Sequence, residues 1–514
     1  MKLYRTEDAK RADSYAINKI GVPSVVLMEH AARGVFEEIV KRFTNIHLNN
    51  FIVVYGTGNN GGDALCLARM LLLAGCKVKL VEAIGKPKTP DSKLQLKMLT
   101  KTAIKNDMFS KIKSGDVLKN INSKTVVIDG VFGTGFNVSK SKQLSKNLIK
   151  LLGSLRKALY VISIDVPSGV DADTGEVING AIKADCTVSF VYPKLGLFIS
   201  PASINSGDIV IKPLFFPTEK IDTKYELITE NMVREMISPI KRKPDSHKGI
   251  YGHVAVLSPE QGMEGAVAMT AMAALRAGAG LVTILAVNES TESIRQRMPM
   301  LTPEIMILNL TINEKNGAEL TQTLVKFNSI IIGPGFGKKR KLILNKILKY
   351  ADVPLVIDAD ALNLISEDSS LFTLIKNKDV ILTPHPGEMT RLVSGLKKIQ
   401  DHRLNILEQF VKRHNICVLL KGYRSMLARK DGMVFINQTG NPALSKAGSG
   451  DTLSGIIGAF IAQGTSVWAS GVLGMYVHGL CADRLIMDEK KSDFGILPTD
   501  IINELGSVIK CLTE

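Results

Sequence analysis

The alternation of short apolar runs with longer helical patterns is the feature that most constrains this fold. In the first half, β-rich runs begin at residues 51, 77, 125, 160 and 186, and segments of helical pattern separate them. Two helical stretches come before these runs, the second starting near Pro23. Strands that alternate with helices are typical of a parallel sheet covered by helices on both faces. The pattern therefore predicts an α/β domain of three layers.

A second α/β domain is predicted beyond residue 245. The alternation stops between residues 213 and 245, where prolines and charges of both signs are scattered, and it resumes in runs that begin at residues 253, 281, 329, 354, 380 and 416. A chain of 514 residues is longer than one hydrophobic core usually serves. We therefore expect domains at residues 1–220 and 225–514. Both halves place glycine-rich turns at strand ends, where open α/β sheets bind ligands.

The composition is that of an ordinary globular protein, with 45% hydrophobic and 22% charged residues. The first 19 residues mix charges of both signs, and no apolar run reaches the ~18 residues that a spanning helix needs. We therefore expect a cytoplasmic protein with no membrane partner. The six cysteines lie far apart without a CxxC pair, which favours reduced, mostly buried thiols over a zinc site.

A net charge of +16 raises the possibility of nucleic-acid binding. Lysines are spread along the chain, aromatic residues make up only 5%, and no nucleic-acid-binding motif occurs. We interpret the charge as a solvated surface that attracts anionic metabolites, and we expect no nucleic-acid partner.

The first glycine-rich turn, in FIVVYGTGNNGGDALCLARMLL, has two interpretations. Its glycines satisfy GxGxxG and Glu82 follows the next run, which is the pattern of an NAD-dependent dehydrogenase. However, Asn59, Asn60 and Asp63 fill the gaps, and a carboxylate at a helix N-terminus repels a pyrophosphate. Such a turn suits a polar ring or a cation better.

Two later strand ends add oxygen atoms: Asp129 in VVIDGVFGTG, and Asp165 with Ser168 in ISIDVPSG. Hard cations prefer oxygen ligands, so Asn60, Asp129 and Ser168 form a candidate cation site if these strands are adjacent. The alternative is that the three residues only form turns and cap helices.

The segments GTGNNGGD, IDGVFGTGF and SIDVPSGVDADTG, in this order, resemble the YjeF N-terminal family, the NAD(P)H-hydrate epimerases, over most of residues 1–215. The resemblance implies a Rossmann-like fold and a K⁺ ion at Asn60, Asp129 and Ser168. It implies hydrate contacts from Asn59, Asn60, Gly61, Gly62, Asp63, Gly133, Thr134, Gly135, Phe136 and Asp165. Ala64 departs from the glycine that the family usually has there. Epimerisation needs proton transfer in both directions, and we nominate Asp165 as the catalytic carboxylate.

The second glycine-rich turn, GSGD, immediately precedes a helix, because Leu453, Ile456, Ile457, Phe460 and Ile461 recur at helical spacing. The amides from Gly448 to Asp451 then stabilise an anion that forms during phosphoryl transfer. Asp451 is placed to draw a proton from an attacking hydroxyl group, although an Asp that only caps the helix is the alternative. No GxxxxGK[ST] motif occurs, which excludes a P-loop enzyme.

With GSGD, the segments SHKGIYGHVAVL, IIGPGFG, VIDADALN, LTPHPGEMTRL and LLKGYRSML resemble the NAD(P)H-hydrate dehydratases, a ribokinase-like family, from about residue 225 onward. The resemblance implies Mg²⁺ with ADP or ATP, a catalytic Asp451, and hydrate contacts from Gly335, His385, Pro386, Gly387, Glu388, Met389, Thr390, Arg391 and Asp451. It implies nucleotide contacts from Lys421, Gly422, Tyr423, Arg424, Ser425, Asn441, Lys446, Ala447, Gly448, Ser449 and Gly450. Without the resemblance, an alternative is that His385 is a neutral loop histidine and Lys421 a solvated loop lysine.

Together the two resemblances predict an enzyme that repairs hydrated NADH or NADPH. The first domain interconverts the R and S hydrates, and the second phosphorylates the S hydrate so that phosphate leaves in place of hydroxide. We expect a homo-oligomer. The rival functions are a ribokinase-like small-molecule kinase fused to a Rossmann-like nucleotide-binding module, a dehydrogenase, and a non-catalytic nucleotide-binding protein.

Overall fold

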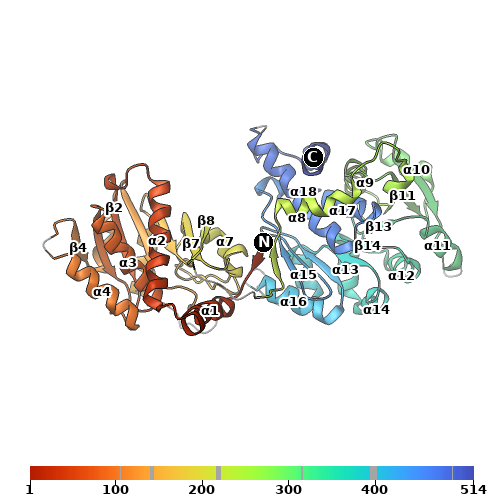
Figure 1. Cartoon of the computed structure of the whole chain (residues 1–514). Coiled ribbons are helices and arrows are strands. Elements are labelled where there is room, and N and C mark those ends of the chain that lie inside the picture. The colour runs from red at the N-terminus through yellow and green to blue at the C-terminus, as the bar shows by residue number, and fades with distance from the viewer. Residues whose placement is uncertain (105, 139–143, 216–220, 314–316, 394–401, 489) are drawn as a thin grey trace. The chain divides into compact units, whose positions relative to one another are not determined.

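The computed structural model describes the chain except residues 105, 139–143, 216–220, 314–316, 394–401 and 489 (Figure 1). It divides into two compact units, residues 2–225 and residues 226–514. None of the described helices is long and apolar enough to cross a membrane. The cysteines are all free thiols, and Cys511 is the exposed one.

The first unit contains a parallel sheet of seven strands in the order β4-β3-β2-β5-β6-β7-β8. These strands are β2 (Asn50–Tyr55), β3 (Lys77–Glu82), β4 (Phe109–Ile112), β5 (Thr125–Gly130), β6 (Tyr160–Ile164), β7 (Cys186–Phe190) and β8 (Asp208–Lys212). The unit also contains β1 (Lys2–Leu3), α1 (Thr6–Tyr15), α2 (Ser24–Arg42), α3 (Asn59–Leu73), α4 (Pro90–Thr102), α5 (Val117–Asn120), α6 (Lys146–Leu155) and α7 (Ala202–Ser206).

Both faces of this sheet are covered by helices, as the pattern predicts. Phe51 and Val53 of β2 pack in one core with residues of α2 and α3. Ile52 and Val54 point to the other face, into a core that includes Leu148 and the rest of the apolar side of α6. The three-layer α/β prediction and the second helix beginning at Pro23 are confirmed.

The second unit contains a larger sheet in which the strands run in the order β9-β18-β17-β16-β15-β14-β13-β10-β11-β12. The strands are β9 (Tyr225–Leu227), β10 (His253–Leu257), β11 (Leu281–Val287), β12 (Met306–Leu310), β13 (Ser329–Ile332), β14 (Leu355–Ile357), β15 (Val380–Leu382), β16 (Cys417–Leu420), β17 (Met426–Ala428) and β18 (Val434–Ile436).

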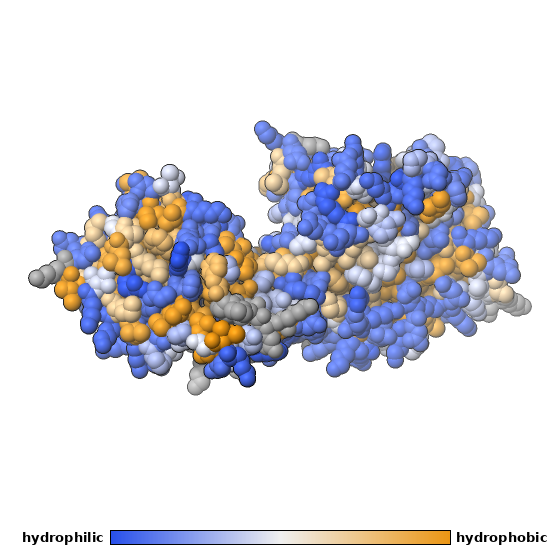
Figure 2. Space-filling model, viewed as in Figure 1, coloured by the Kyte–Doolittle hydropathy of each residue, from blue (hydrophilic) through white to orange (hydrophobic). Residues whose placement is uncertain are grey.

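Helices again lie on both faces of the sheet (Figure 1). One layer includes α8 (Glu230–Ile237), α9 (Glu264–Arg276), α17 (Ser449–Ala462), α18 (Val467–Met487) and α19 (Pro498–Thr513), whose buried residues share a core with β10 and β11. The other helices are α10 (Thr291–Arg297), α11 (Gly317–Leu324), α12 (Lys341–Tyr350), α13 (Ala359–Glu367), α14 (Phe372–Ile375), α15 (Pro386–Leu392) and α16 (Arg403–His414). Figure 2 shows hydrophilic side chains over much of the visible surface of this unit.

The sheet of the second unit is parallel except at one side. β10 to β16 pair in parallel, but β16, β17 and β18 pair antiparallel. β17 and β18 have three residues each and are joined by the turn around Asp431 and Gly432, so a hairpin replaces the crossover helix that parallel strands need. This hairpin begins directly after the Lys421–Ser425 loop and so fixes the direction in which that loop leaves the sheet.

Candidate active sites

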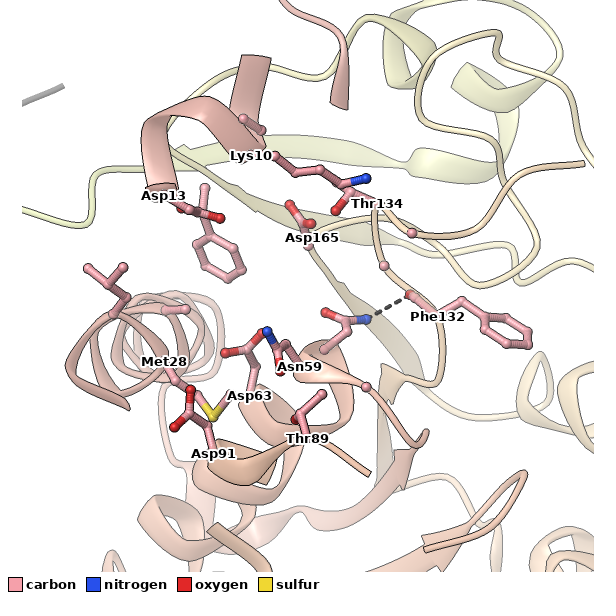
Figure 3. Close-up of a pocket in the computed structure, with 18 of the residues that line it drawn as sticks. Lys10, Asp13, Met28, Asn59, Asp63, Thr89, Asp91, Phe132, Thr134 and Asp165 are labelled. Atoms are coloured by element: carbon pink, nitrogen blue, oxygen red, sulfur yellow. Dashed lines mark hydrogen bonds between the residues drawn. The ribbon is translucent and has the colours of Figure 1, made fainter. Parts of the chain in front are cut away.

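A cavity of about 650 Å³ lies in the first unit, beyond the carboxyl ends of its central strands. Predicted residues that line it are Asn59, Asn60, Asp63, Gly133, Thr134, Gly135, Phe136 and Asp165 (Figure 3). The N-terminal helix α1 adds Lys10 and Asp13, which the sequence did not single out. Gly61 and Gly62 instead lie behind the lining: a Cβ on Gly61 would be 2.1 Å from the Gly56 oxygen, and one on Gly62 would be 2.6 Å from Met28.

Asp165 is held firmly where β6 ends. Its Oδ1 accepts hydrogen bonds from the ammonium of Lys194 at 2.7 Å and from the Ser189 hydroxyl at 3.0 Å. Lys194 is buried and also donates to the Phe190 carbonyl at 2.8 Å. Asp165 has a φ of 64°, a left-handed conformation that costs a non-glycine residue on the order of 1–3 kcal/mol. Such strain is retained where the surrounding structure fixes a side chain for a purpose.

Asp63 and Asp13 line the same cavity without such partners. Neither carboxyl forms a hydrogen bond or ion pair with the residues that the structure describes. Burial, together with the charges of Asp165 and Asp13, raises the pKa of Asp63 well above its usual value. Burial and Asp165 raise the pKa of Asp13 to about 6, against the opposing effect of Lys194.

Asn60, Asp129 and Ser168 come together as the cation hypothesis requires. Asp129 is fully buried and accepts hydrogen bonds from the Ser168 hydroxyl at 2.5 Å and the Ser168 amide at 2.8 Å. The Ser168 hydroxyl accepts from the Phe132 amide at 2.9 Å, and the Asn60 side-chain amide donates to the Phe132 carbonyl at 2.7 Å. The other Asn60 side-chain atom, Oδ1, is buried without a hydrogen-bond partner in the described part of the chain.

The dehydrogenase interpretation finds little support in this geometry. Glu82, its candidate ribose ligand, is exposed, accepts a hydrogen bond from the Tyr55 hydroxyl at 3.0 Å, and is absent from the cavity lining. Asp63, the fifth residue of α3, lines the cavity instead. Ala64 is buried against the glycine that ends β5: a Cβ on Gly130 would be 2.5 Å from the Ala64 Cβ.

In the second unit, Asp451 lies in the first turn of α17, as predicted. The turn is entered through Gly448, whose φ of 92° favours glycine. The Asp451 carbonyl accepts a hydrogen bond from Thr270 of α9 at 3.1 Å, which ties this turn to the neighbouring helix. Burial and the charges of Asp358 and Asp360 raise the pKa of Asp451 to about 6, although Lys421 opposes them.

A buried ion pair lies beside Asp451. The ammonium of Lys421 is 2.6 Å from Oδ1 of Asp358, and the Ser454 hydroxyl of α17 donates to Oδ2 of Asp358 at 2.7 Å. Burial alone lowers the pKa of Lys421, but Asp358, Glu388 and Asp451 outweigh it and the pKa rises. Asp358 is not among the predicted site residues, although the motif VIDADALN contains the signal: a carboxylate at a strand end.

The HPGEM turn forms the cap of α15. The His385 amide donates to Glu388 at 2.8 Å, and His385 Nδ1 accepts from the Gly387 amide at 3.0 Å. Burial, Lys421 and Arg391 lower the pKa of His385, and burial raises that of Glu388. Arg391 donates to Asn363 at 2.9 Å. His385 is thus a neutral capping residue at physiological pH, with half of its side chain exposed.

The predicted nucleotide loop, Lys421 to Ser425, is supported from behind by Arg403, which the sequence analysis missed. Arg403 is buried and donates to the Tyr423 carbonyl at 2.7 Å and the Lys421 carbonyl at 3.2 Å. Burial lowers the pKa of Arg403 to about 10. Arg424 has a φ of 54° and two buried side-chain nitrogens without a hydrogen-bond partner in the described chain, so donors remain for a ligand.

The remaining predicted residues of the second unit lie in the glycine-rich turn at the start of α17 or in the segments that support this turn. Asn441 donates to Asp483 at 3.0 Å, and Lys446 donates to the carbonyls of Phe494 and Ile496, both at 2.6 Å. These two side chains therefore hold the approach to α17 in place. Gly335 follows β13 with a φ of 61°, and its carbonyl accepts from the Glu260 amide at 2.8 Å. A Cβ on Gly450 would be 3.2 Å from the Lys421 ammonium, so the glycine permits this close approach.

Comparisons with known proteins match both units. Residues 24–196 match the family model of the YjeF-related protein N-terminus, and residues 254–506 match that of NAD(P)H-hydrate dehydratase. Two relatives named bifunctional NAD(P)H-hydrate repair enzyme Nnr are similar over nearly the whole length. That of Moorella thermoacetica is 33% identical over 100% of this chain and 98% of its own, and that of Coxiella burnetii is 32% identical over 99% of both.

A solved structure is also similar to part of this chain. The ADP/ATP-dependent NAD(P)H-hydrate dehydratase of Bacillus subtilis, co-crystallised with ATP and Mg²⁺, is 26% identical and covers 56% of this chain and 98% of its own, with a TM-score of 0.46.

Proposed function

Because the chain belongs to the family of bifunctional NAD(P)H-hydrate repair enzymes, we propose that it restores hydrated NADH and NADPH in two steps. The domain of residues 1–220 interconverts the R and S hydrates, and the domain of residues 225–514 dehydrates the S form with ADP or ATP as phosphoryl donor. The observation that carries this proposal is the placement of Asp451 at the glycine-rich start of α17, beside the Lys421–Asp358 pair. This arrangement unites a base with groups that receive a phosphate.

In the dehydratase domain, Asp451 takes the proton of the substrate hydroxyl as its oxygen attacks the terminal phosphorus of the nucleotide. The oxygen–phosphorus bond forms, and the donor loses its terminal phosphate. The lone pair of the ring nitrogen then expels the phosphate and leaves an iminium ion. The neighbouring ring carbon loses a proton to the departing phosphate, and this restores the dihydropyridine. Mg²⁺, bound with the nucleotide, supplies positive charge to the phosphates. The amides of the first turn of α17 stabilise the transferred anion, and Lys421 and Arg424 bind the nucleotide from the loop after β16.

The epimerase assignment is tested by replacing Asp165 with Asn. The variant retains the shape of the side chain but not the carboxylate, so interconversion of R and S hydrates should fall by about 10²-fold or more. Chiral separation of the hydrates measures this rate, and dehydration of pure S hydrate by the same sample checks that the second unit is intact. Full epimerase activity in Asp165→Asn would remove Asp165 from the mechanism.

We also propose K⁺ as the ion of the first unit. The ligands are all oxygens: Asn60 Oδ1, which lacks a partner, Asp129 and the Ser168 hydroxyl. K⁺ would balance the buried charge of Asp129 and hold the three loops around the cavity together. We expect the melting temperature to be higher in KCl than in choline chloride at equal ionic strength, and Asn60→Ala to remove this difference. Asn18→Ala, on exposed helix surface, should retain it; equal melting temperatures for the unchanged protein would exclude the ion.

The pKa of Asp451 predicts how dehydration depends on pH. A base works in its ionised form, so kcat/KM for the S hydrate should be constant above about pH 7 and decline as the pH falls through about 6. The charged groups that face Asp451 are Asp358, Asp360 and Lys421. Asp360→Asn removes one negative neighbour and should move the decline to lower pH. A profile that stays flat to pH 5 in the unchanged protein would contradict the role of Asp451 as base.

We further propose a cytoplasmic homo-oligomer whose partners are the hydrates and ADP or ATP, without nucleic-acid or membrane partners. The spread of lysines along the sequence supports a surface that attracts small anions rather than a nucleic-acid groove. Light scattering measures the oligomeric state. Product analysis separates the kinase alternative, because a ribokinase-like kinase would leave a stable phosphate ester where a dehydratase releases free phosphate.

A further inference from the structure

Four carboxyl groups line the cavity of the first unit, Asp91 of α4 among them, and the partners of the other three differ. These three come from α1 (Asp13), α3 (Asp63) and the residue after β6 (Asp165) (Figure 3). Asp165 accepts from Lys194 and Ser189, whereas Asp13 and Asp63 have no hydrogen-bond or ion-pair partner in the described chain. Of these three, one is a stabilised carboxylate and two are carboxyls without a compensating partner.

The charges around Asp63 favour its protonated form. The groups that face it are Asp13 and Lys10 from α1, Asp91 from α4, and Asp165 with Lys194. Lys194 forms an ion pair with Asp165 at 2.7 Å. Because its positive charge is paired with Asp165, it stabilises a negative charge on Asp63 less. When carboxyls share a partly buried site with too little positive charge, one of them retains its proton. The raised pKa of Asp63 agrees with this assignment, and the charge of Asp13 contributes to it.

We propose that Asp63 and Asp165 are an acid–base pair that epimerises the hydrate by exchanging its hydroxyl group with water. This inference rests on the epimerase function proposed above and assigns the acid and the base within it. Asp63, which otherwise counts only as a substrate contact, becomes a catalytic residue. Lys194 is a positioning residue that holds the Asp165 carboxylate through their 2.7 Å ion pair.

The Asp63 carboxyl gives its proton to the hydroxyl oxygen, the carbon–oxygen bond breaks, and water leaves. The lone pair of the ring nitrogen forms a carbon–nitrogen double bond, so the ring becomes a flat iminium ion. A water molecule adds to the opposite face of the same carbon, and Asp165 takes the proton that this water loses. Exchange with solvent returns the proton from Asp165 and restores it to Asp63.

An acid on one wall and a base on another suit this chemistry, because a flat cation is open to water from either face. The reverse epimerisation uses the same two groups in exchanged roles, as microscopic reversibility requires. The cation forms between carboxylates, which stabilise positive charge as it develops. This offers a reason for a cavity in which carboxyls outnumber ammonium groups.

The test uses the full chain with Asp63→Asn, Asp165→Asn and a matched control, Asp107→Asn, whose side chain is exposed in the same unit away from the cavity lining. Epimerisation of pure R hydrate is followed by chiral separation and corrected for the reaction without enzyme. Asp63→Asn and Asp165→Asn should each lose about 10²-fold or more, and Asp107→Asn should match the unchanged protein. A thermal shift on adding R hydrate shows that each variant still folds and binds.

Two outcomes overturn the inference while leaving the proposed function standing. One is a folded Asp63→Asn variant that epimerises at the rate of Asp107→Asn. The other comes from the reaction in water labelled with heavy oxygen: our mechanism places one labelled oxygen in every epimerised molecule, whereas opening of the ring at the nitrogen retains the original oxygen. Failure of the unchanged protein to epimerise at all would instead reject the epimerase function itself.

Discussion

Replacing Asp451 with Asn lowers the rate of S-hydrate dehydration by about 10²–10⁴-fold, the range that a general base contributes. The amide retains the size of the side chain but does not accept the hydroxyl proton. Nucleotide binding should persist, because the amides of α17 and the loop from Lys421 are unchanged. The measurement is single-turnover recovery of the dihydronicotinamide absorbance, with nucleotide affinity determined by calorimetry.

The same variant should not lose stability. Asp451 has a pKa of about 6 in the folded protein against an ordinary 3.8, so the folded state binds its proton more tightly than the unfolded state. Its contribution to stability therefore decreases as the pH rises from about 4 to 6 and stays low above that range. Asp451→Asn should melt at or above the temperature of the unchanged protein at pH 7, and the gain should vanish near pH 3. Asp352→Asn, exposed in the same unit, is the control.

Lys421→Met is expected to destabilise the second unit by about 3–5 kcal/mol, because it leaves a buried charge unpaired. Asp358 is 1% exposed, and it depends on the ammonium 2.6 Å away. Ser454 and the Ala359 amide donate to Asp358 as well, but neither carries charge. Urea unfolding of the full chain, monitored by hydrogen exchange in β16, measures the loss for this unit.

A double variant separates the lost charge from lost packing. In Lys421→Met with Asp358→Asn, neither charge of this pair remains, so a large part of the stability should return while dehydration stays impaired. If the double variant is as unstable as the sum of the two single variants, the ion pair is not what stabilises this part of the sheet.

The sequence predicted those features that depend on neighbours along the chain. The strand–turn–helix pattern at residues 51–73 and the apolar spacing after Gly448 were sufficient to place Asp63 and Asp451 at helix starts. In the first unit, the apolar runs of the central strands β2, β3, β5, β6 and β7 are β-rich, and the sequence predicted each of them. β4 and β8 were not, because edge strands such as FSKI and DIVIK carry polar residues toward solvent and lose the apolar signal.

Features that depend on distant segments could not be predicted. Nothing in the sequence near Asp13 indicates that α1 contributes to the cavity, since the helix is surface-like in composition. In the sequence, Arg403 is indistinguishable from an exposed helix residue. In the structure it is buried and donates to the loop at Lys421. The partners of Asp165 come from residues 24 and 29 positions further along the chain, so the position of its side chain is also a property of the fold.

The most direct test of the account is the repair of pure R hydrate by the full chain with Mg²⁺ and ADP or ATP. We predict that the unchanged protein restores the dihydronicotinamide absorbance, that Asp165→Asn does so only from S hydrate, and that Asp451→Asn interconverts the hydrates without restoring either. No recovery with either nucleotide, or recovery by Asp451→Asn at the full rate, would contradict it.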